Sequence, residues 1–343
     1  MKNCHNELRK FHAEAVRLDG DMRDKLRGHA DANEDRLEKG LEKNGEPEPC
    51  WFAIQGSYAM RTTVQHPKND YDIDNGVVFS RDDLKGSQGA DKTALAARQM
   101  VCAALLADPL NSFAKDPEVR NNCVRVYYKD GYHVDIPVYR VEDPDSESKI
   151  YELASVDWKK SSPEGVTDWF NGKVKAKRHS DEPENASQFR RMVRLLKKFA
   201  ISRPSWNMPS GFILTVLTEE KFTYYSRDDE AFYYLLCGIR ERLQWWGGLT
   251  VQHPVLTDET ITKTNEDACM VEFKERVQWA IDELAVLFDD SCTKKKALKA
   301  WKYVFNVDFF DEMMEESAVA KSFSILSAEP KSPVQKEGGG RFG

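Results

Sequence analysis

The hydrophobic residues of this 343-residue chain change their spacing once, near residue 165, and that change limits the folds available to it. Before this point, short apolar runs with the two-residue period of β-strands lie between helical stretches. After it, apolar residues recur every three or four positions, which is the period of amphipathic helices. The pattern predicts an α+β first part and an all-helical second part. The helices expected in the second part cover residues 187–203, 211–222, 228–246, 269–288 and 294–306.

Short strands are predicted at four places in the first part. The apolar run 50–54 and the longer run 71–79 are each expected to form a strand. Residues 123–128 and 132–140 are alternating runs separated by an Asp-Gly turn, which is a strong signal for a β-hairpin.

Helices are expected to accompany these strands. Residues 5–43 have a helical rhythm and are predicted to pack against the sheet as one or two helices. Residues 91–107 form a predicted amphipathic helix with Asp91 as its N-cap. Residues 141–165 are acidic, rich in serine and interrupted by prolines, so they are expected to be mostly loop.

These patterns divide the chain into three parts. Residues 1–165 are predicted to form a core lobe with N-terminal helices, and residues 166–326 a helical lobe. Residues 327–343 have almost no apolar content, so they cannot bury a core and are predicted to be a disordered tail.

Composition narrows the classes of function. A formal net charge of −7 argues against stable binding of long nucleic acid through its phosphates. The apolar runs are too short for a membrane span, and the charged N-terminus lacks the apolar core of a signal peptide. The cysteines are scattered singly without a C-x-x-C pair, which argues against structural zinc and a disulfide framework. We therefore expect a cytoplasmic protein without a membrane partner.

Two aspartates interrupt the predicted strand 71–79. Because successive side chains of a strand point to opposite faces, Asp72 and Asp74 share a face and lie roughly 6–7 Å apart. Carboxylates so placed repel each other unless a cation lies between them. Asp135, in the predicted hairpin, lies opposite the buried face of its strand and is a third candidate.

Three acids converging from two strands suit Mg²⁺, which prefers carboxylates together with substrate phosphates, and Mn²⁺ could substitute. Two ions about 3.5–4 Å apart could activate an attacking hydroxyl and stabilise a leaving pyrophosphate. The plainer alternative is a set of solvated strand aspartates. Gly56 and Ser57 favour the metal site, because a glycine admits a ligand close to the backbone and free amides at a helical turn bind phosphate.

Gly56-Ser57, Asp72-x-Asp74 and Asp135 together resemble the signature of the polymerase β-like nucleotidyltransferase superfamily. From about residue 50 to about residue 310, the chain is similar to the bacterial cGAS/DncV-like nucleotidyltransferases (CD-NTases) of CBASS anti-phage systems. The stretches that carry this similarity are YDIDNGVVF, YHVDIPVYR, SSPEGVTDWFNGKV, VRLLKKF, MPSGFIL and ALKAWKYVFN. The resemblance implies a mixed β-sheet flanked by helices, a C-terminal helical-bundle lobe and an active site in the cleft between them.

The resemblance also implies an activity. The protein would be a Mg²⁺-dependent cyclic oligonucleotide synthase that converts nucleoside triphosphates, with ATP and GTP expected, into a cyclic di- or trinucleotide and pyrophosphate. A purine-containing product such as cyclic GMP-AMP is expected. Asp72, Asp74 and Asp135 would hold the metal, and Asp135 would assist the attacking hydroxyl.

Substrate contacts are expected outside the three acids. On the predicted helix 187–203, Arg190, Arg194 and Lys197 line one border of the apolar stripe, while Arg191 and Lys198 point away from it. An ordinary solvated basic face would also explain that border. The resemblance favours Lys197 as a contact to the triphosphate.

Two further residues complete the implied set of substrate contacts. Ser210 stands just before a predicted helix, where it suits an N-cap, and it also matches the phosphate-contacting serine of the family. Gln55 adjoins the Gly56-Ser57 turn. The C-terminal Gly343 is a candidate conjugation site, since some members of the family are joined through their C-terminus to a target by a ubiquitin-transfer-like partner; a solubilising tail is the simpler alternative.

Two other functions stay open on the sequence. A nucleotidyltransferase of the same superfamily could act on another acceptor, such as an RNA 3′ end or a small molecule. A catalytically silent scaffold could bind nucleotides without turning them over. The sequence leaves open the base specificity, the ring size, the linkage, the oligomeric state and whether activity needs a trigger.

Overall fold

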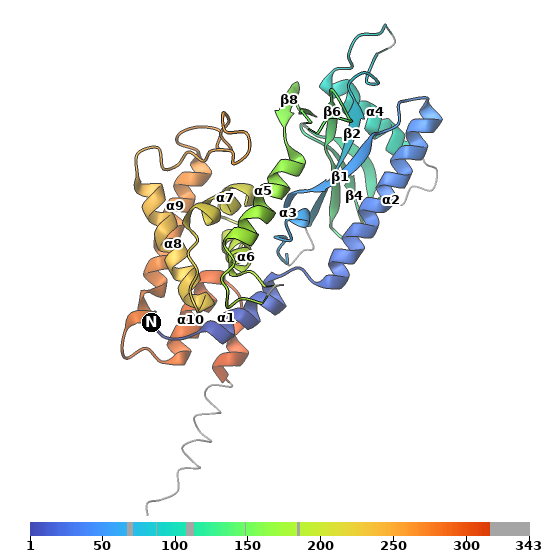
Figure 1. The fold of residues 1–343 in the computed structure, drawn as a ribbon. Helices are drawn as coiled ribbons and strands as arrows, with labels where there is room; N and C mark the ends of the chain where they lie inside the picture. Colours follow the sequence, from blue (N-terminus) through green and yellow to red (C-terminus); the bar gives the residue numbers. More distant parts are fainter. Residues whose placement is uncertain (67–70, 87, 108–112, 148, 184–185, 316–343) are drawn as a thin grey trace, which may run out of the picture.

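A mixed β-sheet and a bundle of helices make up the part of the chain that the computed structural model describes (Figure 1). That part comprises residues 1–66, 71–86, 88–107, 113–147, 149–183 and 186–315. The expected α+β architecture, with helices flanking a mixed sheet and a helical C-terminal part, is confirmed. None of the helices in these ranges is both long and apolar enough to span a bilayer.

The sheet is built around a central nine-residue strand, β2 (Asp72–Ser80). β1 (Trp51–Gln55) runs antiparallel to β2, while β5 (His133–Ile136) and β6 (Val138–Val141) both run parallel to it. The sheet continues antiparallel on either side, and its strand order is β3-β4-β5-β2-β6-β7-β8 with β1 paired to β2. The remaining strands are β3 (Lys115–Val119), β4 (Val124–Tyr127), β7 (Tyr151–Ala154) and β8 (Trp158–Ser161).

Two long helices cover one face of the sheet. α2 (Gly20–Asn44) packs on α4 (Ala94–Leu106), and both contribute to a core that also contains Ile73, Val77 and Phe79 of β2. These odd-numbered residues point toward the helices because side chains alternate along a strand. The even-numbered positions, Asp72 and Asp74 among them, therefore lie on the face turned away from α2 and α4, as the alternation predicts.

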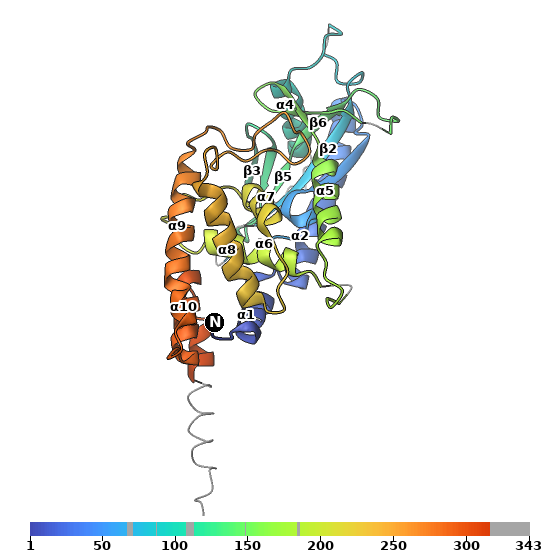
Figure 2. The ribbon, with the colours of Figure 1, turned by 60° about the vertical axis from the view of Figure 1, so that its left-hand side comes forward.

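The helical part has its own core. Its helices are α5 (Pro163–Ala176), α6 (Gln188–Ala200), α7 (Gly211–Lys221), α8 (Asp228–Gln244), α9 (Ala268–Leu284), η2 (Ala285–Phe288) and α10 (Lys294–Phe305). α6 is the central one, because most of its residues are buried although it carries five basic side chains. Figure 2 shows α8 in front of α6 and α9 alongside α8.

The first helix belongs to this second core. α1 (His5–Phe11) and the π-helical turn η1 (His12–Val16) bury Leu8, Phe11 and Val16 among the C-terminal helices. The expectation that residues 5–43 pack against the sheet is therefore right for α2 and wrong for α1. Figure 1 shows α1 beside α8 and α10 and α2 running along the sheet. The division at residue 165 stays a prediction.

Two local predictions are corrected. The N-cap of α4 is Thr93, whose hydroxyl accepts a hydrogen bond from the Ala96 amide, whereas Asp91 pairs with Lys85 and Arg81. Residues 151–161, expected to be loop, form the antiparallel strands β7 and β8. Backbone pairing to β6 stabilises this edge, and the exposed polar side chains of β8 gave no alternating signal.

Two further predictions concern the β4–β5 hairpin and the C-terminal tail. The hairpin of β4 and β5 forms around Asp130-Gly131 as predicted. The tail 327–343 and Gly343 lie outside the described residues.

Candidate active site

The pairing of β2 with β5 brings two of the predicted acids side by side. Asp74 and Asp135 are directly opposite each other in this parallel pair, and Asp72 is opposite His133. Residues opposite each other in neighbouring strands point to the same face, so the three carboxylates share the face turned away from α2 and α4. Asp72 is exposed, Asp74 is half-buried and Asp135 is buried.

The carboxylate of Asp74 is the most perturbed of the three. Its pKa is raised to about 7. Burial is the largest cause, and the negative charges of Asp135 and Asp72 add to it. The positive charges of Arg125 and Lys197 act in the opposite direction and do not overcome this effect. The fixed charges around Asp74 therefore leave its ionised form short of cationic neighbours.

Arg125 on β4 occupies the space beside Asp135. Its Nε lies 2.6 Å from Asp135 Oδ1 and its Nη2 lies 2.7 Å from Asp135 Oδ2, which is a bidentate ion pair. The same guanidinium is 3.5 Å from Asp72 Oδ1. Both oxygens of Asp135 thus accept from Arg125. In the described ranges, no three Asp, Glu, His or Cys side chains are arranged as a ready metal site.

The residues present nevertheless fit a divalent cation. The carboxylates offer the hard oxygen ligands that Mg²⁺ prefers, and a cation would relieve the repulsion of Asp135 and Asp72 that, after burial, helps to raise the pKa of Asp74. A cation bound here would face competition from Arg125 for Asp135. Asp72, Asp74 and Asp135 as metal ligands stay a prediction.

The Gly56-Ser57 turn lies directly against Asp74. Gly56 has φ +65° and opens the short helix α3 (Gly56–Ala59), and a Cβ added to it would overlap the Asp74 carboxylate. Only glycine combines that backbone conformation with such a close approach. Ser57 Oγ is 3.1 Å from Thr63 Oγ1. The phosphate contact expected of Gly56 and Ser57 stays a prediction, now placed beside the acids.

Lys197 enters the same region from α6. It is buried, and its Nζ donates to Thr62 Oγ1 at 2.9 Å. Burial lowers the pKa of Lys197 to about 7; Arg194 lowers it as well, while the negative charge of Asp74 raises it. Arg190 and Arg194, which share the predicted border, instead line a separate pocket, together with Arg191. Arg191 is buried against Asp228 rather than solvated.

Ser210 is the N-cap of α7, where its hydroxyl accepts from the Ile213 amide at 3.4 Å, so the structural half of its predicted role is confirmed. Its neighbour Gly211 approaches Lys197 so closely that an added Cβ would lie 3.1 Å from Lys197 Cε. Ser210 thus stands next to the lysine that is expected to bind phosphate, and its own phosphate contact stays a prediction.

Gln55 lies opposite Asp74 across the β1–β2 pair. Its Oε1 accepts a hydrogen bond of 3.0 Å from the Tyr139 hydroxyl, which fixes the side chain near the acids. The substrate contact expected of Gln55 stays a prediction.

The sequence interpretation missed two residues of this site. Arg125 could have been found, because the hairpin register places it opposite Asp135. His133 is not among the residues predicted for the site, but its Nε2 is 3.4 Å from Asp72 Oδ1. The signal for His133 was its position two residues before Asp135 on the same face of the strand.

Part of the first lobe matches the model of a known protein family. Residues 50–139 match the family model of the cyclic GMP-AMP synthase DncV-like nucleotidyltransferase domain. This range contains Gly56, Ser57 and the three aspartates, although not Lys197 or Ser210.

Solved structures resemble the whole chain at low sequence identity. Vibrio cholerae DncV with bound 3′-deoxy ATP is 16% identical with a TM-score of 0.69, covering 89% of this chain and 95% of DncV. Escherichia coli CdnC with ATP is 17% identical with a TM-score of 0.66, covering 89% and 98%. The Bradyrhizobium diazoefficiens CD-NTase CdnG with GTP is 16% identical with a TM-score of 0.67, covering 92% and 98%. Residues 50–139 therefore match the DncV-like nucleotidyltransferase domain, and the described part of the chain has the fold seen in DncV and in the CD-NTase CdnG.

Proposed function

We propose that this protein joins nucleoside triphosphates into a cyclic oligonucleotide and releases pyrophosphate. The observation that carries the proposal is the placement of Asp74 opposite Asp135, with the Gly56-Ser57 turn in contact with Asp74. The activity of a protein with a similar structure supports it, since Vibrio cholerae DncV is a cyclic AMP-GMP synthase and has been solved with the linear intermediate 5′ pppA(3′,5′)pG. ATP and GTP, which occupy similar structures, are the substrates we propose.

In each round, a 3′- or 2′-hydroxyl oxygen attacks an α-phosphorus, the bond to the β-phosphate oxygen breaks, and pyrophosphate leaves. The hydroxyl proton passes to solvent. A second attack within the linear product closes a dinucleotide ring, and a trinucleotide requires one more round. The catalytic contribution of the chain is positioning and charge neutralisation.

Mg²⁺, or Mn²⁺ in its place, would supply positive charge to the phosphates and to the attacking oxygen when bound. Asp72, Asp74 and Asp135 would hold it, with Asp135 nearest the attacking hydroxyl. Gly56 and Ser57 would donate to the triphosphate beside these acids. Lys197 would place its ammonium close to the same phosphates, and its burial would strengthen that attraction.

The finer parts of the proposal concern the product and its biological use. We propose a purine-containing ring such as cyclic GMP-AMP, made in the cytoplasm as a signal in bacterial anti-phage defence. We also propose Gly343 as a point of attachment for a ubiquitin-transfer-like partner. If a chain lacking Gly343 were still conjugated by its cognate proteins, the attachment proposal would be wrong.

The test is incubation of the full chain with the four nucleoside triphosphates and Mg²⁺ or Mn²⁺, followed by mass spectrometry and a pyrophosphate assay. We expect a cyclic product, and no product from the Asp72→Ala, Asp74→Ala double variant. Asp82→Ala with Asp83→Ala is the matched control, because it removes two exposed acids just after the same strand.

Other outcomes identify the alternatives. Normal turnover by the Asp72→Ala, Asp74→Ala variant would contradict the proposal. Pyrophosphate release only after an RNA or a small-molecule acceptor is added would favour the transferase with another acceptor. Nucleotide binding without any product would favour the silent scaffold.

A further inference from the structure

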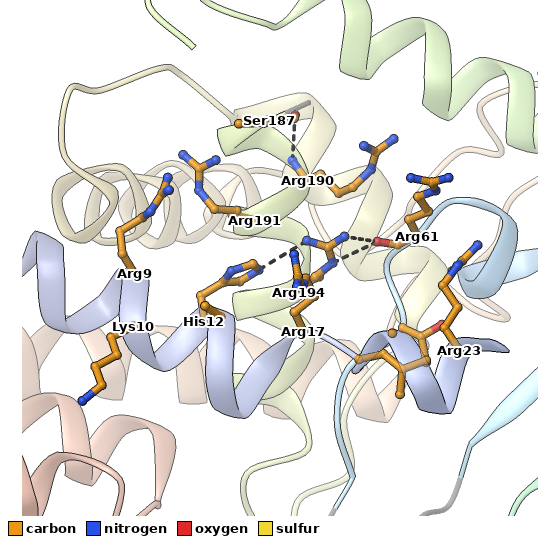
Figure 3. Close-up of a pocket in the computed structure, with 15 residues that line it drawn as sticks. Arg9, Lys10, His12, Arg17, Arg23, Arg61, Ser187, Arg190, Arg191 and Arg194 are labelled. Atoms are coloured by element: carbon orange, nitrogen blue, oxygen red, sulfur yellow. Dashed lines mark hydrogen bonds between the residues drawn. The ribbon is translucent and has the colours of Figure 1, made fainter. Parts of the chain in front are cut away.

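A cavity of about 580 Å³ lies between the N-terminal segment and α6, and its wall is strongly basic (Figure 3). It shares no residue with the predicted site of the acids, the Gly56-Ser57 turn, Lys197 and Ser210. No acidic residue is among its described lining residues. The basic or titratable side chains of the lining are Arg9, Lys10, His12, Arg17, Arg23, Arg61, Arg190, Arg191 and Arg194.

These side chains come from distant parts of the sequence. α1, η1 and α2 provide one wall, the segment after α3 a second and the start of α6 a third. In Figure 3, Arg61, Arg23 and Arg190 lie together at one end, and Arg9 and Arg191 at the other. Arg17 and Arg194 lie between the two groups, whereas Lys10 points away. The fold thus gathers guanidinium groups around one hollow.

The positive charges in this pocket repel one another. The pKa of Arg194 is lowered to about 9. Burial is the largest cause, and the positive charges of Arg190 and Arg17 add to it. Burial also lowers the pKa of Arg190, with Arg61 and Arg23 adding to the shift. For His12, burial and then Arg194 lower the pKa to about 3, so its ring is neutral. Such crowding is unfavourable unless anions compensate it.

The protein supplies only part of that compensation. Arg191 Nε lies 2.7 Å from Asp228 Oδ2, and Arg9 Nη1 lies 4.0 Å from the same oxygen. Within the described residues, Arg17, Arg61 and Arg190 have no carboxylate partner, and Nε of Arg190 is buried without a hydrogen-bond partner. Arg194, Arg23 and Arg190 donate instead to uncharged oxygens, those of Arg61, Tyr58 and Asn171. Within the described residues these positive charges are therefore not neutralised by a paired carboxylate.

We propose that this pocket binds a small ligand that carries several closely spaced phosphate groups. Guanidinium forks bind phosphate oxygens two at a time, and several of them converge here. The volume of this open pocket suits a small molecule, and the net charge of −7 disfavours a long nucleic acid. An inorganic oligophosphate and the phosphate chain of a nucleotide share this chemistry. The inference does not depend on the proposed catalytic function.

The experiment is calorimetric titration of the full chain with inorganic tripolyphosphate and, separately, with ATP, both without divalent cations. The first host is a Lys197→Gln, Ser210→Ala variant, which removes two proposed triphosphate contacts of the candidate active site, neither of which lines the pocket. We expect this variant to bind one tripolyphosphate, with an affinity that weakens as salt is added. Stronger binding of ATP than of tripolyphosphate would identify a nucleotide as the ligand, and equal binding would show that the phosphates suffice.

The pocket is then altered in the same host by Arg17→Gln and Arg61→Gln, two exposed side chains whose replacement leaves both cores intact. We expect the affinity to fall by about tenfold or more, since two charge-assisted contacts are lost. Arg178→Gln with Lys299→Gln is the control, because it removes the same charge from exposed positions outside the pocket.

Three results would overturn the proposal. They are no binding by the host variant, an equal loss in the control, or binding that persists after Arg17 and Arg61 are replaced. Failure of the proposed catalytic function appears separately, as absence of pyrophosphate release from the wild-type chain, and does not affect these titrations.

Discussion

Asp74 and Lys197 are the two residues of the candidate site whose usual charges are least favourable where they lie. Burial raises the pKa of Asp74 and lowers that of Lys197, in each case to about 7. Each charge partly offsets the penalty on the other, because a carboxylate and an ammonium attract. Near neutral pH, each of these two groups is therefore partly protonated.

The raised pKa of Asp74 predicts a pH dependence of stability. Below about pH 4 this carboxyl is protonated in both folded and unfolded chains, and between about pH 4 and 7 the unfolded chain ionises first. Asp74 therefore lowers the free energy of unfolding progressively over that window. In metal-free buffer, Asp74→Asn should match the wild type near pH 4 and become relatively more stable up to pH 7, as measured by thermal unfolding. Parallel curves for the two proteins would contradict this assignment.

Arg125 and Asp135 form the other residue pair with a measurable consequence. Arg125→Gln leaves the buried Asp135 without its bidentate partner, so the free energy of unfolding should fall by about 2 kcal/mol. Mg²⁺ should then stabilise the variant more than it stabilises the wild type, because the competing guanidinium is gone. Thermal unfolding with and without Mg²⁺ measures both effects.

The control for this pair is Arg120→Gln, which removes an exposed arginine paired with Glu118. A change at Arg120 as large as the change at Arg125 would mean that general electrostatics, and not the Asp135 contact, is responsible.

At the scale of elements, the site depends on a strand, a tight turn and a second strand. β1 delivers the chain to Gly56, and β2 returns Asp74 to a position against that glycine. β5, whose preceding hairpin strand is β4, adds Asp135. None of these elements holds the site alone.

Gly56→Ala tests this arrangement, because the new methyl group would displace the Asp74 carboxylate as well as strain a residue with φ +65°. We expect at least about a hundredfold loss of pyrophosphate release, since misplacing a catalytic group by about 1 Å has that effect. Gly45→Ala is the matched control, as Gly45 has φ +66° but no atom within contact of an added Cβ. It should cost about 1 kcal/mol of stability and leave activity unchanged; an equal loss of activity in both variants would refute the role of the Asp74 contact.

Elements with local signals were predictable from the sequence, and those set by distant pairing were not. The β4–β5 hairpin followed from Asp130-Gly131, and the shared face of Asp72 and Asp74 followed from strand alternation. The parallel pairing of β2 with β5 has no local signal, so the strand pattern could offer Asp135 as a candidate but could not place it opposite Asp74. β7 and β8 were missed because backbone pairing to a neighbour holds them rather than their own pattern.

The candidate site could also be predicted only in part from the sequence. The family pattern pointed to Lys197, but its burial against Thr62 depends on packing between α6 and the segment after α3. The arginine pocket has no sequence signature at all, because its members are spread from Arg9 to Arg194 and only the fold brings them together.

At the scale of the molecule, one continuous N-terminal segment contributes to both cores. α1 and η1 pack among the C-terminal helices, and α2 packs on the sheet. Arg194, Lys197 and Lys198 of α6 add hydrogen bonds to the segment 61–65 of the other lobe. These connections predict that the two lobes unfold together.

Phe11→Ala tests this coupling from the helical side. The Phe11 ring is fully buried and lies 4.8 Å from the ring centre of Phe305 and 5.1 Å from that of Phe310, so its loss should lower the free energy of unfolding by about 3 kcal/mol or more. If the lobes are coupled, the amide hydrogens of β2 in the other lobe should also exchange faster, as measured by hydrogen exchange. Val156→Ala, at an exposed position, should change neither quantity. Faster exchange confined to the helical lobe would show instead that each core unfolds separately, and the N-terminal segment would then join the lobes without making them one cooperative unit.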